Sequence, residues 1–169
     1  KMTVQFNLFG GTLLSIGTKK HHKLLDDIDS FKKIGCFGLS ELGYGNNAVK
    51  METKAVFNPA SGEITINTPN ALAQKYWITN GALHAHYCLV FADLRIRDDD
   101  QKEGYGPTEG VHAFLVPIRD LKTHEPLPGV TIEDMGHEMG LNGIDNAKLS
   151  FDNVKIPRSN MLDRYAQLT

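Results

Sequence analysis

The chain has 169 residues, of which 41% are hydrophobic and 22% charged, and its formal net charge at pH 7 is −2. This length suits one domain with a substantial core. The nearly neutral charge argues against nucleic-acid binding, because phosphate recognition needs a clustered cationic face. No apolar run approaches the ~20 residues of a membrane-spanning helix. Cys36 and Cys88 lie far apart without a metal-binding spacing, which favours a reducing compartment over a disulfide framework.

The first 34 residues carry apolar side chains at helix-like intervals. Gly17 and Thr18 separate two groups of them, so the pattern predicts two helices, at about 8–16 and 20–33. Lys32 and Lys33 end the second group, where positive charge suits the C-terminal end of a helix.

From residue 35 onward the pattern changes to short apolar segments separated by turn-forming residues. Segments 51–57 and 63–68 flank NPASG at 58–62 and predict a hairpin. Further predicted strands are 75–79, 85–96, 111–118, 130–135 and 147–156. The polar stretch 97–110 predicts an exposed loop. The expected fold is mainly β, an antiparallel β-barrel preceded by two helices.

The glycine-rich stretch CFGLSELGYGNN at 36–47 has the composition of a phosphate-binding loop but not its spacing. It lacks the third glycine of a dinucleotide-binding fingerprint and the Lys-Ser/Thr pair of a P-loop. Around Ser40 it also lacks the second glycine of a nucleophile elbow. We interpret it as a loop whose amides and Ser40 hydroxyl can bind ligand oxygens. A plain helix-to-strand turn is the alternative.

The segment KYWITNG at 75–81 contains the only tryptophan of the chain. Trp77 and Thr79 are two residues apart on a predicted strand, so they should point to the same side. Two interpretations stay open. Trp77 is either a core residue beside an Asn-Gly hairpin turn, or the aromatic wall of a site for a flat ligand whose polar edge Thr79 binds.

The histidines do not form a recognisable metal motif. His84 and His86 would share one face of a strand, yet a metal site needs a third ligand, and the sequence proposes none. We therefore expect structural histidines and no metal.

Several segments together closely resemble the middle part of the acyl-CoA oxidases, which are peroxisomal flavoenzymes related to the acyl-CoA dehydrogenases. These segments are CFGLSELGYGNN, METKAVFNPASGEITINTP, KYWITNG, GVHAFLVPIRDLKTHEPLPGVTI and GHEMGLNGIDNAKLSFDNVKIPRSNML. The likeness runs from about residue 31 to residue 164 and is nearest to plant and algal oxidases of medium- to long-chain substrates. The block GLNGIDNAKLSFDNVKIPR is highly specific, whereas WITNG alone is less so.

The resemblance implies how the chain is organised. Residues 1–34 would end an N-terminal helical domain, 35–156 would form the β-barrel that faces flavin and acyl-CoA, and 157–169 would lead into a C-terminal helical domain. Family members are dimers or larger, with FAD near a subunit interface, so a homodimer is expected. A peroxisomal location follows from the resemblance alone.

The implied activity is FAD-dependent oxidation of a fatty acyl-CoA to a trans-2-enoyl-CoA, with molecular oxygen reduced to hydrogen peroxide. WITNG is the dehydrogenase form of its motif, whereas the commoner oxidase form resembles WWPGG. An acyl-CoA dehydrogenase with a protein electron acceptor is therefore the alternative enzyme. A module that binds flavin or acyl-CoA without catalysis is the other alternative.

Five residues match flavin-binding positions of the family. Ser40 stands where a threonine hydroxyl usually bonds the pyrimidine edge of the flavin, and it would stabilise negative charge there as a donor. Thr79 matches a position that faces the flavin near N5, and Trp77 matches the aromatic residue packed against the ring. Leu39 and Gly45 match loop positions with backbone contacts.

Two further residues of the loop have different expectations. Asn46 stands where dehydrogenases often have a serine near flavin phosphate and substrate, so it is the candidate substrate-binding residue. Glu41 fits the loop motif and not the position of a catalytic base. The family's catalytic base is a glutamate of the C-terminal helical domain, so no catalytic residue is expected in this chain, which should be inactive alone.

Overall fold

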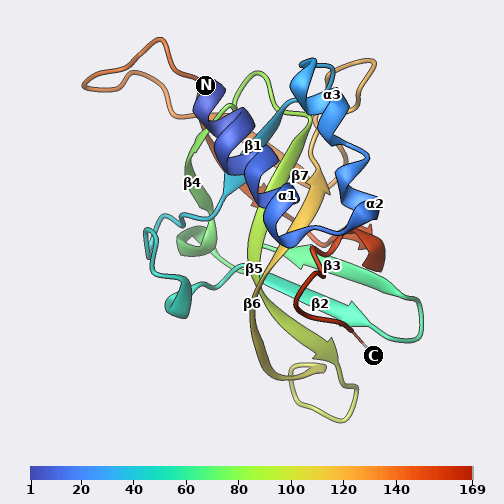
Figure 1. The fold of residues 1–169 in the computed structure, drawn as a ribbon. Coiled ribbons are helices and arrows are strands. Elements are labelled where there is room, and N and C mark those ends of the chain that lie inside the picture. Colours follow the sequence, from blue (N-terminus) through green and yellow to red (C-terminus); the bar gives the residue numbers. More distant parts are fainter. Residues whose placement is uncertain (169) are drawn as a thin grey trace.

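The computed structural model describes residues 1–168, which form two β-sheets and a small layer of helices (Figure 1). The helices are Val4–Gly10 (η1, a π-helix), Gly11–Ile16 (α1), Lys19–His22 (α2) and Leu25–Asp29 (α3). The strands are Gly35–Gly38 (β1), Lys54–Asn58 (β2), Glu63–Asn67 (β3), Lys75–Thr79 (β4), Tyr87–Arg97 (β5), Tyr105–Pro117 (β6), Val130–Asp134 (β7), Asn146–Phe151 (β8) and Val154–Pro157 (β9). Short 3-10 turns occupy Ala48–Lys50 (η2), Ala71–Ala73 (η3) and Arg158–Asn160 (η4). Within the described residues, no helix is long and apolar enough to cross a membrane.

The larger sheet is mixed and centres on the long strand β5. Strand β6 runs antiparallel along one edge of β5, and β1 and β2 run parallel to β5 along the other edge, one after the other. Strands β3 and β9 extend this sheet beyond β2. The predicted antiparallel direction is therefore wrong for β1 and β2 against β5, while the other strand pairs are antiparallel. Alternation shows which side chains face the core but not which strands become neighbours. The mainly β class and the preceding helices are confirmed.

The smaller sheet is antiparallel, with the strand order β4-β8-β7. It joins the larger sheet where β3 and β8 end, because Thr68 N donates to Phe151 O over 2.7 Å and Phe151 N donates to Thr68 Oγ1 over 2.9 Å. The main core lies where these sheets pack together, and its largest fully buried members are Phe114, Phe151, Ile64, Ile66, Ile78, Ile118, Leu94 and Leu149.

The helices (blue in Figure 1) lie over the other face of β5 and β6. Leu89 and Leu115 from these strands pack there against Phe9 and Leu13. Strand β5 is thus apolar on both faces, as the run CLVF predicts for a central strand. Gly35 is needed at the start of β1, because a Cβ atom there would lie 2.2 Å from the Phe9 ring.

The helical boundaries differ from the prediction. The first helix begins at residue 4 instead of 8, and the second is divided into α2 and α3 and ends at Asp29. The buried Gln5 side chain explains this early end. Its Nε2 donates to Ile28 O (3.0 Å) and Lys33 O (2.9 Å), and its Oε1 accepts from Gly35 N (2.9 Å). These bonds direct the chain toward β1, so the lysines expected in the last helical turn lie beyond the helix.

Most predicted strands are confirmed, with two changes in extent. The hairpin over 58–62 forms with Asn58 opposite Glu63, and β4 has the predicted bounds. The predicted strand 147–156 is two strands, because the chain turns at Asn153, whose φ is +50°. The predicted loop 97–110 is shorter, since β6 already begins at Tyr105.

Candidate functional site

Five of the six predicted site residues line one pocket with a volume of about 220 Å³. The pocket lies beside η1, the loop after β1 and the end of β4. Its lining residues are Val4, Leu8, Phe37, Leu39, Ser40, Asn46, Trp77 and Thr79. None of these eight side chains carries a formal charge, so the pocket is apolar with a few neutral polar groups.

Trp77 reaches this pocket because β4 is irregular. The pairing of β4 with β8 shifts register between Lys75 and Ile78, and Trp77 has a φ of +63°. Such a backbone conformation is rare for a bulky residue and tends to occur at functional sites. Lys75 and Ile78 are consequently buried, whereas Trp77 is 51% exposed. The core interpretation of Trp77 was therefore wrong, and so was the hairpin after it, since β4 pairs with β8 and not with β5.

Both hydroxyl groups in the pocket donate to a carboxamide. Ser40 Oγ donates to Asn46 Oδ1 over 2.7 Å, and Thr79 Oγ1 donates to Asn146 Oδ1 over 2.7 Å. A hydroxyl has one proton, so one that is already donated leaves lone pairs for a ligand. This differs from the expected donor role of Ser40. Asn146, which no sequence signal singled out, is buried at the start of β8 and bonds Glu138 through its Nδ2.

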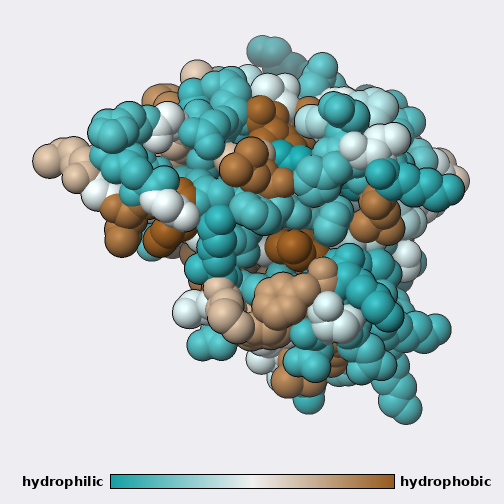
Figure 2. Space-filling model, turned by 90° about the horizontal axis from the view of Figure 1, so that it is seen from above, coloured by the Kyte–Doolittle hydropathy of each residue, from teal (hydrophilic) through white to brown (hydrophobic). Residues whose placement is uncertain are grey.

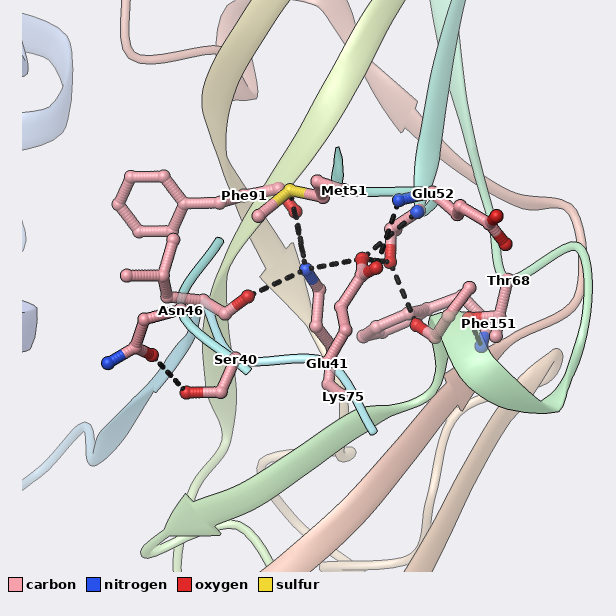
Figure 3. A network of polar contacts seen from close by, with 12 residues as sticks. Ser40, Glu41, Asn46, Met51, Glu52, Thr68, Lys75, Phe91 and Phe151 are labelled. Carbon is pink, nitrogen blue, oxygen red and sulfur yellow. Dashed lines mark hydrogen bonds and ion pairs between the residues drawn. The ribbon is translucent and has the colours of Figure 1, made fainter. Parts of the chain in front are cut away.

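A buried ion pair lies beneath the loop of the pocket (Figure 3). Lys75 Nζ is 3.1 Å from Glu41 Oε1, and the two side chains are 0% and 1% exposed. The ammonium also donates to Leu39 O over 3.2 Å and to Phe91 O over 2.7 Å. Burial disfavours the charged ammonium and lowers the pKa of Lys75 to about 8, although the nearby Glu41 carboxylate opposes this shift.

The Glu41 carboxylate is fully engaged in this network. It accepts from Glu52 N over 2.9 Å, from Thr53 N over 3.0 Å and from Thr53 Oγ1 over 2.5 Å, besides its bond to Lys75. A carboxylate that is buried and bound in this way cannot take a proton from a ligand in the pocket. The geometry thus supports assigning Glu41 to the loop and not to catalysis.

Backbone hydrogen bonds tie the loop to β4, so that both sides of the pocket form one unit. Tyr76 N donates to Ser40 O over 3.0 Å, and Leu42 N donates to Gln74 O over 2.9 Å. Gly45 closes the loop with a φ of +56°, a conformation that favours glycine. Its N–H and C=O both bond to Glu41. Gly45 is not among the residues that line the pocket.

Residues 36–154 match the family model for the acyl-CoA dehydrogenase middle domain. The chain is also 48% identical over 171 residues to the peroxisomal acyl-coenzyme A oxidase 2 of Arabidopsis thaliana, a match that covers 100% of this chain and 24% of that relative. The chain belongs to the acyl-CoA dehydrogenase and oxidase family. It spans about a quarter of the length of the curated relatives it matches.

Solved structures of the family share this fold at more than 25% identity. The acyl-CoA oxidase-1 of Caenorhabditis elegans, complexed with FAD and ATP, has a TM-score of 0.91 and 34% identity, covering 99% of this chain and 25% of that one. The acyl-CoA oxidase-2 of the same organism, bound with FAD, ascaroside-CoA and ATP, has a TM-score of 0.88 and 37% identity, covering 96% and 23%.

His84 and His86 have structural partners. His84 and His86 precede β5 in a turn, so the prediction that they share a strand face was wrong. His84 Nδ1 lies 2.5 Å from Asp145 Oδ2, and His86 Nδ1 accepts from Ile34 N over 3.2 Å. Among residues 1–168, no three His, Cys, Asp or Glu side chains group as metal ligands would.

Proposed function

We propose that this chain is the flavin-facing middle domain of a peroxisomal, FAD-dependent acyl-CoA oxidase. The full-length enzyme would oxidise a fatty acyl-CoA to a trans-2-enoyl-CoA and reduce molecular oxygen to hydrogen peroxide. The observation that carries this proposal is the single pocket that joins Leu39, Ser40, Trp77 and Thr79 from two separate segments. The peroxisomal oxidase among the relatives and the FAD-complexed oxidase among the solved structures support it.

The pocket fits the isoalloxazine ring of a flavin. The half-exposed Trp77 indole offers a flat apolar face, and the hydroxyls of Ser40 and Thr79 offer polar contacts for the edge of the ring. An uncharged lining suits an uncharged ring. When bound, the flavin supplies the two-electron chemistry, while this chain orients the ring and excludes water from one side of it.

Each predicted residue has a proposed role on this basis. Thr79 would lie near flavin N5, Trp77 would pack against the ring, and Leu39 would contribute a backbone contact. Gly45 was predicted to contribute one as well, but it does not line the pocket and its N–H and C=O both bond to the backbone of Glu41, so its proposed role is to shape the loop. Ser40 would bond the pyrimidine edge. Because its proton goes to Asn46, Ser40 would accept the ring N3–H, and the donors for developing negative charge would be loop amides.

The substrate would reach the same pocket. Asn46 lies at its exposed edge and is the proposed contact with a fatty acyl-CoA, a class supported by the ascaroside-CoA in a related solved structure. The proton acceptor would belong to the C-terminal helical domain, since Glu41 is buried and occupied. Residues 1–34, 35–156 and 157–169 would be the end of the N-terminal helical domain, the barrel domain and the lead into that C-terminal domain, in an enzyme that forms a homodimer.

The second candidate is an acyl-CoA dehydrogenase, which passes its electrons to a protein acceptor. The presence of Thr79 in the WITNG segment favours it, because this is the dehydrogenase form of the motif. The surrounding segments favour the oxidase, as do the Arabidopsis relatives, which are acyl-coenzyme A oxidases.

One experiment on the full-length protein separates these candidates. Its flavin is reduced anaerobically with a long-chain acyl-CoA, and oxygen is then admitted while the absorbance of the flavin is followed. Bleaching with rapid recovery and peroxide formation would establish the oxidase. Bleaching that persists in air would establish the dehydrogenase. If no flavin is bound, or none is bleached, the chain is part of a binding module instead.

A further inference from the structure

The Thr79 hydroxyl begins a chain of hydrogen bonds that leads out of the pocket to Glu138. We infer that Asn146 and Glu138 are positioning residues that fix the Thr79 hydroxyl as a hydrogen-bond acceptor toward the pocket. This inference rests on the proposed function and adds to it a device that favours the reduced form of the flavin.

The direction of every bond in this chain follows from the chemistry of Glu138. A carboxylate can only accept hydrogen bonds, so the group that faces it must be the Asn146 amide nitrogen, at 3.0 and 3.3 Å from the two oxygens. The Asn146 oxygen therefore faces Thr79. Since that oxygen also only accepts, the Thr79 hydroxyl must donate its proton to it over 2.7 Å. Lone pairs alone are left for the pocket.

The surrounding structure holds this series of hydrogen bonds from Thr79 to Glu138 in place. Asn146 is 4% exposed, and in the pairing of β8 with β4 it lies directly opposite Thr79. Glu138 sits in the loop between β7 and β8, where Glu138 N donates to Asn142 Oδ1 and Asn142 Nδ2 donates to Glu138 O, both over 2.7 Å. These bonds keep the carboxylate beside Asn146.

The other hydroxyl of the pocket has no comparable restraint. The bond between Ser40 and Asn46 is exposed, so water can replace either partner and the hydroxyl can turn. Only Thr79 has a fixed direction, and only a group with a fixed direction can distinguish a donor from an acceptor on the ligand.

A flavin offers that distinction at the position proposed for Thr79. Oxidised flavin has a bare nitrogen at N5, which can only accept, whereas two-electron-reduced flavin carries an N–H there, which donates. A fixed acceptor at Thr79 would bond the reduced form and not the oxidised one. We expect the reduced flavin to be favoured about tenfold by this contact, equivalent to about 30 mV for a two-electron couple.

The test measures the midpoint potential of the flavin in the full-length holoenzyme, by reductive titration against a reference dye. In Asn146→Leu the Thr79 hydroxyl can turn and donate to oxidised flavin, so the potential should fall by about 30 mV. Glu138→Gln keeps the size of the side chain but lets the Asn146 amide face either way, so a smaller fall is expected. Thr79→Val removes the hydroxyl and should also lower the potential.

The double variant Thr79→Val with Asn146→Leu decides whether Asn146 acts through Thr79. No further fall beyond that of Thr79→Val is expected, because the hydroxyl that Asn146 orients is gone. The matched control is Asn160→Leu, which removes a hydrogen bond to Leu115 O over 2.7 Å at a residue that does not line the pocket. Its potential should equal that of the wild type.

The outcomes separate this inference from the proposed function. A wild-type protein without flavin, or with flavin that acyl-CoA does not bleach, refutes the proposed function. Normal bleaching with equal potentials in the wild type, Asn146→Leu and Glu138→Gln overturns the inference alone, as does an Asn146→Leu shift that persists beside Thr79→Val. If Asn146→Leu does not fold, the midpoint potential of Glu138→Gln provides the test, because Glu138 is only half-buried and lies on a loop.

Discussion

The two sides of the pocket are built differently, although each supplies a hydroxyl bonded to an asparagine. The loop after β1 carries Ser40 and lies over the buried Lys75–Glu41 ion pair. The side formed by β8 and the loop before it holds Thr79 through a neutral hydrogen bond between the Thr79 hydroxyl and Asn146, and that loop exposes the apolar side chains of Met139 and Leu141. Viewed from above, the molecular surface shows small groups of hydrophobic residues separated by hydrophilic residues (Figure 2).

This difference assigns different tasks to the two sides. Breaking a buried ion pair leaves a charge without compensation, so the loop after β1 should be sensitive in stability. Breaking a neutral hydrogen bond costs less, so the side of Thr79 should be sensitive mainly in the properties of a bound ligand. Substitutions on each side can test this division. For each variant of the full-length protein, thermal unfolding and flavin affinity should both be measured.

The largest effect is expected from Lys75→Met. It leaves the Glu41 carboxylate buried without its cation, which should destabilise the protein by about 3–5 kcal/mol and lower Tm. Adding Glu41→Leu removes the stranded charge and should restore part of the lost stability, because apolar replacements of a whole buried pair are often tolerated. A single variant as stable as the wild type would show that the pair does not hold the loop.

The pH dependence of stability is the next largest effect. The pKa of Lys75 is about 8 in the folded protein, below its ordinary value of 10.5, so between these values the unfolded state binds more protons than the folded state. Stability from this group must therefore rise as pH increases from about 8 to 10.5, by up to about 1.4 kcal/mol per pH unit. Relative to the Lys75→Met, Glu41→Leu variant, the wild type should gain in Tm between pH 7.5 and pH 9.5. A constant difference would contradict the lowered pKa.

Substitutions of Trp77 should affect the stability of the protein and its affinity for FAD in different ways. Its φ of +63° is strained for tryptophan and natural for glycine, so Trp77→Gly should unfold at a higher temperature than Trp77→Ala, by about 1 kcal/mol in free energy. Both variants lose the flat aromatic face, so both should bind FAD about 2–10-fold more weakly. Equal stability of the two would remove the argument that the backbone is strained to present the indole.

The sequence predicted the parts of this site that depend on local pattern. The spacing of Trp77 and Thr79 predicted that they share a side, and the loop around Ser40 was recognised as exposing polar groups. The irregularity of β4 that exposes Trp77 while Lys75 is buried was not predicted. The ion pair was missed because Glu41 and Lys75 are 34 residues apart, and nothing local indicates that a lysine at the start of an apolar strand is fully buried.

Strand direction and the contact between Asn146 and Thr79 could not be predicted from the sequence, for the same reason. Both depend on which strands become neighbours, and alternation along one strand carries no information about its partner. The parallel pairing of β1 and β2 with β5, and the position of Asn146 opposite Thr79 across β4 and β8, arise only in the folded chain.

The smallest effect is expected at Ser40, and it sharpens the comparison between the two hydroxyls. Ser40→Ala removes an exposed hydroxyl whose proton is already donated to Asn46. The flavin would lose one ordinary hydrogen bond, so its binding free energy should weaken by about 0.5–1.5 kcal/mol, which is about 2–10-fold in affinity. The loss should be similar for oxidised and reduced flavin, because the ring N3–H that Ser40 would accept is a donor in both forms, so the midpoint potential should not move. Equilibrium titration of the apoprotein with FAD, followed by the potential measurement, checks both parts. A large drop in potential would instead mean that Ser40 is a fixed donor to the reduced ring, and the assignment of fixed polarity to Thr79 alone would fail.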